Sequence, residues 1–476
     1  VQNGSLPIEK LDTAVRNILK VGVQATAITK AYPSFDQAAS LETMEKVLRE
    51  SMILLKNDGT LPLAETCDVA FFGKRSMHPT ICPAGSSNVS TDLTTNIYNS
   101  TSAILGADHV TFGNAPERTQ YCIAVVGCDG REGADREHMS MDADDIQALE
   151  QAIEQASANN GKVIVVLNAT GPVDLSAYES RVNAILCPFF SGIQGGKVTA
   201  DAIFGRFNPS GKLALTWPKH YYDCPSYKNF GGENREVWYG EGMYVGYRWY
   251  DARHIAPAYP FGYGLSYTTF AITNVSVENN INIDKEEVKV NITVKNTGRH
   301  SGSEVVQVYV HDVECVFDRP EKDLKGFKKV FLQPGEEKTV SIELPKSAFQ
   351  GYYLEFGEWI AQPGEFDILV GTSALDIVSQ QRICVRCRDP FGISFRSSIG
   401  KIAKCEDAVQ IINQNIEDDI LLLAHVALEF APDKTLDELW NGTNIQGALK
   451  GKGWNDEKIL HVRRQIEDSF DSIANR

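Results

Sequence analysis

The pattern of apolar residues changes twice along the chain, and these changes constrain the fold more than any other feature. Between about residues 40 and 220, short apolar runs alternate with segments of helical periodicity. The runs at 69–72, 123–126 and 163–167 are bounded by glycine or polar residues. Such runs are typical of strands buried on both faces of a mostly parallel sheet. This region is therefore predicted to be an α/β domain.

Two helices are expected within this domain. One is predicted by five apolar residues at helical spacing, Met44, Val47, Leu48, Met52 and Leu55. A turn-rich segment over 56–63 follows this helix. The other is predicted after Asp142, because Asp145 and then apolar residues at helical spacing follow it. Asp142 is expected to be the N-cap of that helix, which would pack on the sheet.

A different periodicity begins near residue 268. Apolar and polar residues then alternate strictly, as at Val288, Val290, Ile292 and Val294, and the turn at 296–298 separates this run from the next. Regular short strands with glycine and proline turns predict a β-sandwich of the immunoglobulin or fibronectin type.

The remaining segments are predicted from weaker patterns. Residues 221–267 are rich in tyrosine and tryptophan and form a long irregular connection, a kind of segment that tends to be functional or to wrap another domain. The last hundred residues show helical spacing at Leu421–Leu423, Val426, Leu428, Ile459, Val462 and Ile466. At the start of the chain, an apolar stripe predicts a helix that needs a surface to cover: Leu11, Val15, Ile18 and Leu19.

The predicted organisation has five parts. They are the end of an earlier domain with a linker (1–39), the α/β domain (40–220), the aromatic connection (221–267), the β-sandwich (268–380) and a helical C-terminal extension (381–476). A chain of 476 residues is long enough for roughly two to four domains, so this division is reasonable.

The charge and the apolar content of the chain limit which kinds of partner it can bind. The formal charge is −16, with 46 basic and 62 acidic side chains, which makes nucleic acid an unfavourable partner. No apolar stretch reaches the roughly 20 residues of a membrane span, so no membrane insertion is expected. A neutral sugar is compatible with this charge. No signal peptide is visible, and the sequence leaves both a cytoplasmic and a secreted location open.

The sequence lacks the motifs of several common metal and catalytic sites. Cys384 and Cys387 form a lone CxxC without a second pair or a histidine cluster, so no structural zinc is expected, and most cysteines are interpreted as buried free thiols. The sequence contains neither HExxH nor GxSxG. No metal or organic cofactor is predicted.

The loop 127–141, GCDGREGADREHMSM, is the most informative segment for function. It directly follows the run 123–126, and ligands of open α/β sheets bind at the carboxyl ends of strands. Its glycines do not have GxGxxG spacing, and its acidic side chains would repel a pyrophosphate, which argues against a nucleotide site. Glu132, between Gly130 and Gly133, suits a general acid that must reach a glycosidic oxygen. A solvated polar loop is the alternative.

A second loop, Pro83 to Ser90 (PAGSSNVS), follows another short strand region. Ser86 or Ser87 could hydrogen-bond sugar hydroxyls there. Because glycine and serine stretches are commonly only turns, that alternative also stays open.

Longer segments resemble family 3 glycoside hydrolases. SMILLKNDGTLPL (51–63) resembles the entry to the family's α/β-sandwich domain, EGADR (132–136) is similar to its acid/base loop, and FNPSGKLALTWP (207–218) resembles the segment that closes the domain. YGEGMYVGYRWYD (239–251) and YPFGYGLSYTTF (259–270) resemble the bridge to a fibronectin type III-like domain. Three further segments resemble parts of that fibronectin type III-like domain: NTGRHSGSEVVQVYV (296–310), residues 319–340 and PGEFDILVGTSALDI (363–377).

This resemblance implies a function and its site. Glu132 corresponds to the acid/base, and Ser86 to a possible contact with the bound sugar. The opening VQNGSLPIEKLDTAVRNILKVG resembles the end of the family's TIM-like barrel, and the nucleophilic aspartate of that barrel has no counterpart in these 476 residues. The family loop often has a small residue where this chain has Arg131, which bears on how Glu132 is placed.

The sequence therefore predicts part of a retaining β-glycosidase that hydrolyses terminal β-D-glucosides or β-D-xylosides. Its expected partners are the β-linked glycoside and a barrel segment of the same enzyme, and an oligomer is possible. The alternative is a non-catalytic carbohydrate-binding or assembly module. A retaining enzyme needs two carboxyl groups about 5 Å apart, so Glu132 alone is expected not to turn over substrate.

Overall fold

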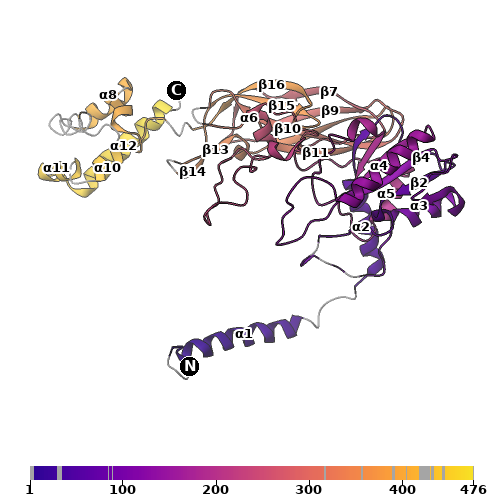
Figure 1. Cartoon of the computed structure of the whole chain (residues 1–476). Helices are drawn as coiled ribbons and strands as arrows, with labels where there is room; N and C mark the ends of the chain where they lie inside the picture. Colours follow the sequence, from indigo (N-terminus) through magenta and orange to yellow (C-terminus); the bar gives the residue numbers. More distant parts are fainter. Residues whose placement is uncertain are drawn as a thin grey trace. The chain divides into compact units, whose positions relative to one another are not determined.

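The computed structural model describes residues 5–28, 35–83, 85–87, 89, 91–315, 318–354, 357–388, 392–403, 405–416, 429, 434–441 and 445–474 (Figure 1). The chain divides into two compact units, Val1–Leu48 and Arg49–Arg476. The first unit holds helix α1 (Ile8–Ile28) and most of α2 (Gln37–Ser51). The apolar residues predicted to line one side of the first helix, Leu11, Val15, Ile18 and Leu19, are in α1 and are exposed.

The second unit begins with a six-stranded sheet. Its strands are β1 (Ile53–Asn57), β2 (Val69–Phe72), β3 (Val110–Phe112), β4 (Tyr121–Cys128), β5 (Lys162–Ala169) and β6 (Ala184–Cys187). Their order is β1-β6-β5-β4-β2-β3, and every pairing is parallel except that of β1 with β6. The predicted α/β domain with a mostly parallel sheet is confirmed.

The order of these strands has a functional consequence. The chain goes from β2 outward to β3 on one side and then crosses to β4 on the other side of β2. A reversal of this kind is a topological switch point, where the loops after two neighbouring strands diverge and leave a crevice. In this sheet the crevice is expected at the carboxyl ends of β2 and β4.

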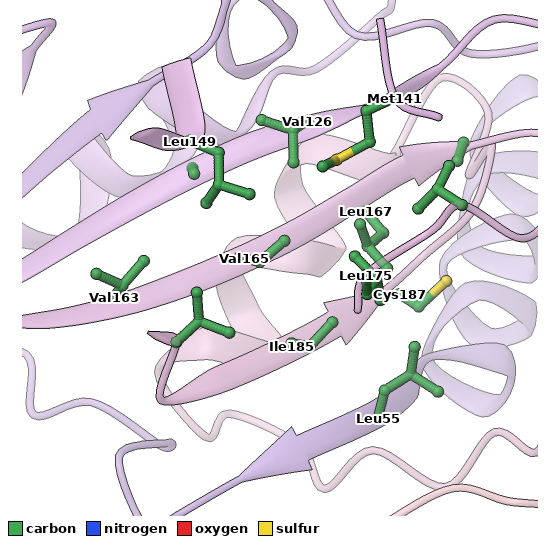
Figure 2. Close-up of a cluster of buried hydrophobic side chains, with 14 of the residues drawn as sticks. Leu55, Val126, Met141, Leu149, Val163, Val165, Leu167, Leu175, Ile185 and Cys187 are labelled. Atoms are coloured by element: carbon green, nitrogen blue, oxygen red, sulfur yellow. The ribbon is translucent and has the colours of Figure 1, made fainter. Parts of the chain in front are cut away.

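The sheet is covered by α3 (Ile97–Leu105), α4 (Ala143–Ala158) and α5 (Gly195–Ile203). Figure 2 shows one face of the sheet, where Val163, Val165 and Leu167 of β5 lie near Leu149 of α4 in one apolar cluster. The alternate residues of β5, Ile164 and Val166, are also buried. Burying both faces stabilises the sheet by about 1.5–3 kcal/mol for each large aliphatic side chain, which is why the strand has no polar alternation.

Two predictions about helices need correction. The predicted helix face from Met44 to Leu55 ends earlier, because α2 stops at Ser51 and Leu55 lies in β1. The run 53–55 is buried on both faces in the sheet, which outweighs its helical spacing. Asp142 does occupy the N-cap position of α4, but its side chain does not cap the helix; it binds Arg75 instead.

The connection after the sheet is irregular except for α6 (Tyr247–Arg253) and one short 3-10 helix, Tyr221–Asp223. The other 3-10 helices are Lys74–Ser76, Ala107–His109, Glu179–Arg181 and Lys346–Phe349.

Two sheets follow and form the predicted sandwich, and their strands pair antiparallel except for the parallel pair of β16 with β8. One sheet has the order β12-β9-β7, with β7 (Phe270–Val277), β9 (Val288–Asn296) and β12 (Glu337–Leu344). The other has the order β11-β10-β15-β16-β8, with β8 (Ile281–Asn282), β10 (Gly302–Asp312), β11 (Asp323–Leu332), β15 (Gly364–Gly371) and β16 (Ile377–Arg386). Strands β13 (Gln350–Tyr353) and β14 (Glu358–Ala361) form a hairpin. The alternating residues Val288, Val290, Ile292 and Val294 all enter the core between the sheets, as expected.

The sandwich and the α/β domain are joined by direct contacts. Leu54 of β1 forms a bridge to Leu265, and Lys212 forms an ion pair with Glu304 of β10 at 2.6 Å. Gln307 of β10 donates a hydrogen bond to the carbonyl of Gly262. The connection 221–267 therefore ends in a segment held by both domains.

The C-terminal region has its own small core. Its helices are α7 (Ile399–Ala403), α8 (Glu406–Asn415), α10 (Leu436–Asn441), α11 (Ile445–Gly451) and α12 (Asp456–Ala474). Ile459, Val462 and Ile466 of α12 are buried in one hydrophobic cluster with Trp440, which confirms the predicted helical extension. The stripe predicted over 421–428 lies outside the described residues. Strand β16 runs to Arg386, past the boundary predicted at residue 380.

Two general properties bear on function. Within the described part of the chain, no helix combines the length and apolarity that a membrane crossing requires. Cys67, Cys122, Cys128 and Cys187 are buried free thiols, and burial raises the pKa of Cys67 and Cys122 to about 11. The thiols of Cys67 and Cys122 are therefore protonated near neutral pH and packed as small apolar groups.

Candidate active site

Two loops extend from the switch point of the sheet. The first follows β2 and contains Ser86, and the second follows β4 and contains Glu132. The two strands are neighbours and parallel, so both loops leave the same edge of the sheet. The two residues singled out from the sequence are therefore on adjacent loops, although 46 positions separate them.

Glu132 lies in a tight turn at the tip of its loop. Arg131 and Ala134 form a bridge, and the backbone N–H of Ala134 donates to the carbonyl of Arg131 at 3.2 Å. Gly133 has a φ of 76°, a conformation that glycine adopts without strain. The turn leaves the side chain of Glu132 exposed, as a group that must meet an external substrate would be.

Ser86 makes two hydrogen bonds to Glu132. Its Oγ donates to Oε2 of Glu132 at 2.6 Å, and its backbone N–H donates to the same oxygen at 3.1 Å. The side-chain hydrogen bond, followed by the backbone one, lowers the pKa of Glu132 below its ordinary value. The carboxyl group is therefore ionised at neutral pH while this contact is made.

Gly85 allows the two loops to approach each other. Its φ is 103°, and a Cβ atom at this position would lie 2.9 Å from both Cβ and Oε2 of Glu132. A larger residue would therefore be strained in its backbone and would also collide with the carboxylate. The glycine lets the backbone N–H of Ser86 reach Glu132.

The sequence interpretation missed the group beneath this site. Arg75, in the 3-10 helix after β2, is buried and forms ion pairs with Asp129, Asp142 and Asp145. The signal was present as three aspartates around the loop 127–141; Asp145 is the buried one among them, and a buried carboxylate needs a cation. The spacing of about 70 residues between Arg75 and Asp145 hid the pairing.

Arg136 lies close to Glu132 in the sequence, but its hydrogen bonds go to other residues. Its guanidinium donates to Sγ of Cys128 at 2.8 Å and to the carbonyl of Pro172 at 3.0 Å. These bonds tie the loop back to the ends of β4 and β5. In the part of the chain that is described, no three histidine, cysteine, aspartate or glutamate side chains are grouped to hold a metal ion.

Comparison with known proteins identifies the two main domains. The family model for the glycosyl hydrolase family 3 C-terminal domain matches residues 52–267, and that for the fibronectin type III-like domain matches residues 304–374. Thermostable β-glucosidase B of Acetivibrio thermocellus is 35% identical over 459 residues, which cover 88% of this chain and 60% of that protein. An exo-α-(1→6)-L-arabinopyranosidase of Bifidobacterium breve is 34% identical, over 79% of this chain and 53% of that protein.

Solved structures agree with these relatives. The family 3 β-glucosidase of Bifidobacterium adolescentis superposes with a TM-score of 0.71 at 31% identity, over 86% of this chain and 63% of that one. β-Glucosidase 3B of Thermotoga neapolitana gives a TM-score of 0.70 at 29% identity, over 80% of this chain and 59% of that one. The chain thus spans about 60% of the length of such relatives. Residues 52–267 therefore form a glycosyl hydrolase family 3 C-terminal domain, and residues 304–374 belong to a fibronectin type III-like domain.

Proposed function

We propose that this chain supplies the general acid/base of a retaining β-glycosidase that hydrolyses terminal β-D-glucosides or β-D-xylosides. Glu132 is the proposed acid/base, and Ser86 the proposed contact to the bound sugar. The observation that carries the proposal is the meeting of these two exposed side chains at the switch point of the sheet. The relatives named β-glucosidase support the class of reaction.

Glu132 has two tasks in this proposal. It first protonates the glycosidic oxygen of the leaving group, and then removes a proton from the water that hydrolyses the glycosyl-enzyme. The lowered pKa of Glu132 in its contact with Ser86 suits the second task, which needs the ionised form. For the first task the carboxyl must hold its proton, so the substrate has to displace Ser86 and exclude water, both of which raise the pKa.

Ser86 links these two states. Its Oγ donates to Glu132 in the free chain, and when a sugar hydroxyl takes that hydrogen bond the serine binds substrate and releases the carboxyl at once. The nucleophile of this reaction is a second carboxylate about 5 Å from Glu132, which we assign to a TIM-like barrel segment outside these 476 residues. The proposed reaction needs no metal or organic cofactor.

The test combines this chain with a barrel segment from a family 3 relative and replaces Glu132→Gln. Glycosides with poor leaving groups depend on protonation, whereas activated aryl glycosides do not, so the loss should be on the order of 100-fold or more for the first and much smaller for the second. Glu137→Gln, in the same loop and also exposed, is the matched control and should change neither rate.

Three outcomes would contradict the proposal. Equal losses on both substrates would point to another acid. Hydrolysis by the pure 476-residue chain would show that it needs no external nucleophile. Binding of glucosides without any hydrolysis in the presence of a competent barrel would favour a carbohydrate-binding or assembly module.

A further inference from the structure

Arg75 stands out among the charged residues of the α/β domain. Within the described residues it is the one arginine or lysine that is fully buried, with 2% of its side chain exposed. Burial lowers the pKa of a guanidinium, but here the hydrogen bonds and charges of Asp145 and Asp129 outweigh it and raise the pKa above its ordinary value. Arg75 is therefore a permanent buried cation, and its partners are held in place by it.

The guanidinium uses all three of its nitrogens. Nε donates to Oδ2 of Asp145 at 2.5 Å, and Nη2 donates to Oδ2 of Asp142. Nη1 donates to Oδ1 of Asp129 at 2.7 Å and to Oγ1 of Thr80 at 2.9 Å. A planar fork with five N–H groups can bind these partners together, which a lysine ammonium at the end of a flexible stem cannot do.

These partners mark both ends of the loop that carries Glu132. Asp129 directly follows β4, whereas Asp142 occupies the N-cap position of α4 and Asp145 lies in its first turn. Oδ2 of Asp145 also accepts a hydrogen bond from the backbone N–H of Gly127 at 3.1 Å. One side chain thus fixes where the loop leaves the sheet and where it returns.

The same cluster holds the segment that leads to Ser86. Oγ1 of Thr80, which accepts from Arg75, donates to Oδ1 of Asp129 at 2.8 Å. Asn168 of β5 brackets the backbone of Thr80, because its Oδ1 accepts from the N–H and its Nδ2 donates to the carbonyl, both at 2.9 Å. Thr80 is therefore clamped between Arg75 and the neighbouring strand, six residues before Ser86.

We propose that Arg75 is a positioning residue, which holds Glu132 against Ser86 by fixing the bases of both loops at once. The inference rests on the proposed function for the meaning of that contact, but the contact itself can be tested without any hydrolysis. The hydrogen bonds of Arg75 among the described residues go to Asp129, Asp142, Asp145 and Thr80, and not to Glu132 or Ser86, so it would act through these four partners.

The test uses the full 476-residue chain and the substitutions Asp129→Asn and Arg75→Lys. The side chain of Asp129 is 63% exposed, so its amide variant should fold even if Arg75→Lys does not. In both variants the amides of the two loops should exchange with solvent on the order of tenfold faster than in the parent chain. The pKa of Glu132, followed by carbon-13 NMR, should rise toward its ordinary value as the contact with Ser86 is populated less.

Asp144→Asn is the matched control. It removes one carboxylate from the same helical turn, which pairs with the exposed neighbour Lys74 at 3.2 Å and makes no bond to Arg75. This variant should leave loop exchange and the pKa of Glu132 unchanged. The proposal is overturned if folded Asp129→Asn keeps both readouts at the parent values, because the cluster would then only stabilise the fold. A lack of glycosidase activity in any combination would bear on the proposed function and not on this result.

Discussion

Oγ of Ser86 lies 2.6 Å from Oε2 of Glu132, and the backbone N–H of the same serine donates to the same oxygen at 3.1 Å. The two residues come from loops after adjacent parallel strands, and both bonds favour the ionised carboxylate. Ser86, the proposed sugar contact, thus favours the ionised form of Glu132, the proposed acid/base. This arrangement can be tested residue by residue.

Replacing Ser86→Ala removes the shorter of the two bonds. Since a hydrogen bond to the ionised form lowers a pKa, its loss should raise the pKa of Glu132 toward the ordinary value, as measured by NMR titration of the carboxyl carbon. The acid limb of any pH profile that depends on ionised Glu132 should move to higher pH. Ser87→Ala is the control, because Oγ of Ser87 donates to the carbonyl of Pro83 and should leave this titration unchanged.

Replacing Gly85→Ala tests the close approach of the loops. The added Cβ meets Glu132 at 2.9 Å, and the positive φ costs roughly 1–2 kcal/mol of stability in addition. Gly59→Ala, at a φ of 94° with no atom near its Cβ, carries the backbone cost alone. We expect both variants to lose unfolding free energy, Gly85→Ala more than Gly59→Ala because it adds the collision with Glu132, and the pKa of Glu132 to change only in Gly85→Ala. An unchanged titration of Glu132 in both variants would mean that the loops can shift to make room for the added methyl group while Ser86 keeps its hydrogen bonds to Glu132.

The sequence was sufficient for the fold class for a physical reason. Strands such as β5 are buried on both faces, and a continuous apolar run records that burial directly. Alternation in β9 records a strand with one buried face in the same way. Where a run was short, local spacing was misleading: Leu55 continues the helical spacing that begins at Met44, but it lies in β1, which pairs with β6, and only the tertiary fold supplies that pairing.

The site was only partly predictable. Glu132 and Ser86 could be singled out because each lies after a strand, but their contact depends on the crossing that makes β2 and β4 neighbours. Asp142 was expected to cap a helix, and instead it binds Arg75, which lies 67 residues earlier. Local rules favour the cap, whereas a buried guanidinium competes for the same carboxylate more strongly than a backbone N–H does.

The ion pair between Lys212 and Glu304 should contribute strongly to the stability of the joined domains. The two side chains are 13% and 10% exposed, and removing one partner of such a pair leaves the other charge desolvated. Glu304→Ala should therefore lower the free energy of unfolding by about 3–5 kcal/mol in urea. Glu337→Ala breaks the exposed pair with Lys295 and should cost about 0–1 kcal/mol. Equal effects would show that Lys212 regains solvent when its partner is lost.

The connection 221–267 carries several large apolar side chains that are exposed. In one stretch of it, six large ones are at least 47% exposed: Phe230, Val237, Trp238, Tyr239, Met243 and Val245. Trp249 differs from Trp238, because its ring is half-buried and its Nε1 donates to the carbonyl of Asp223. Full burial of such side chains contributes about 1.5–3 kcal/mol each, so this stretch strongly favours binding to another protein surface.

The 476-residue chain on its own should therefore not behave as a monomer of 52.5 kDa. Light scattering should report self-association, or a tightly held barrel segment when one is supplied, since either would bury the exposed stretch. Substituting Trp238→Ser together with Tyr239→Ser should weaken that association, because these two side chains are 71% and 81% exposed. Trp359→Ser is the matched control, as this tryptophan is 64% exposed in the β13–β14 hairpin of the sandwich. A compact monomer in which a fluorescence quencher cannot reach Trp238 would defeat the prediction, because the stretch would then be covered by the chain itself and an independent binding module would be favoured.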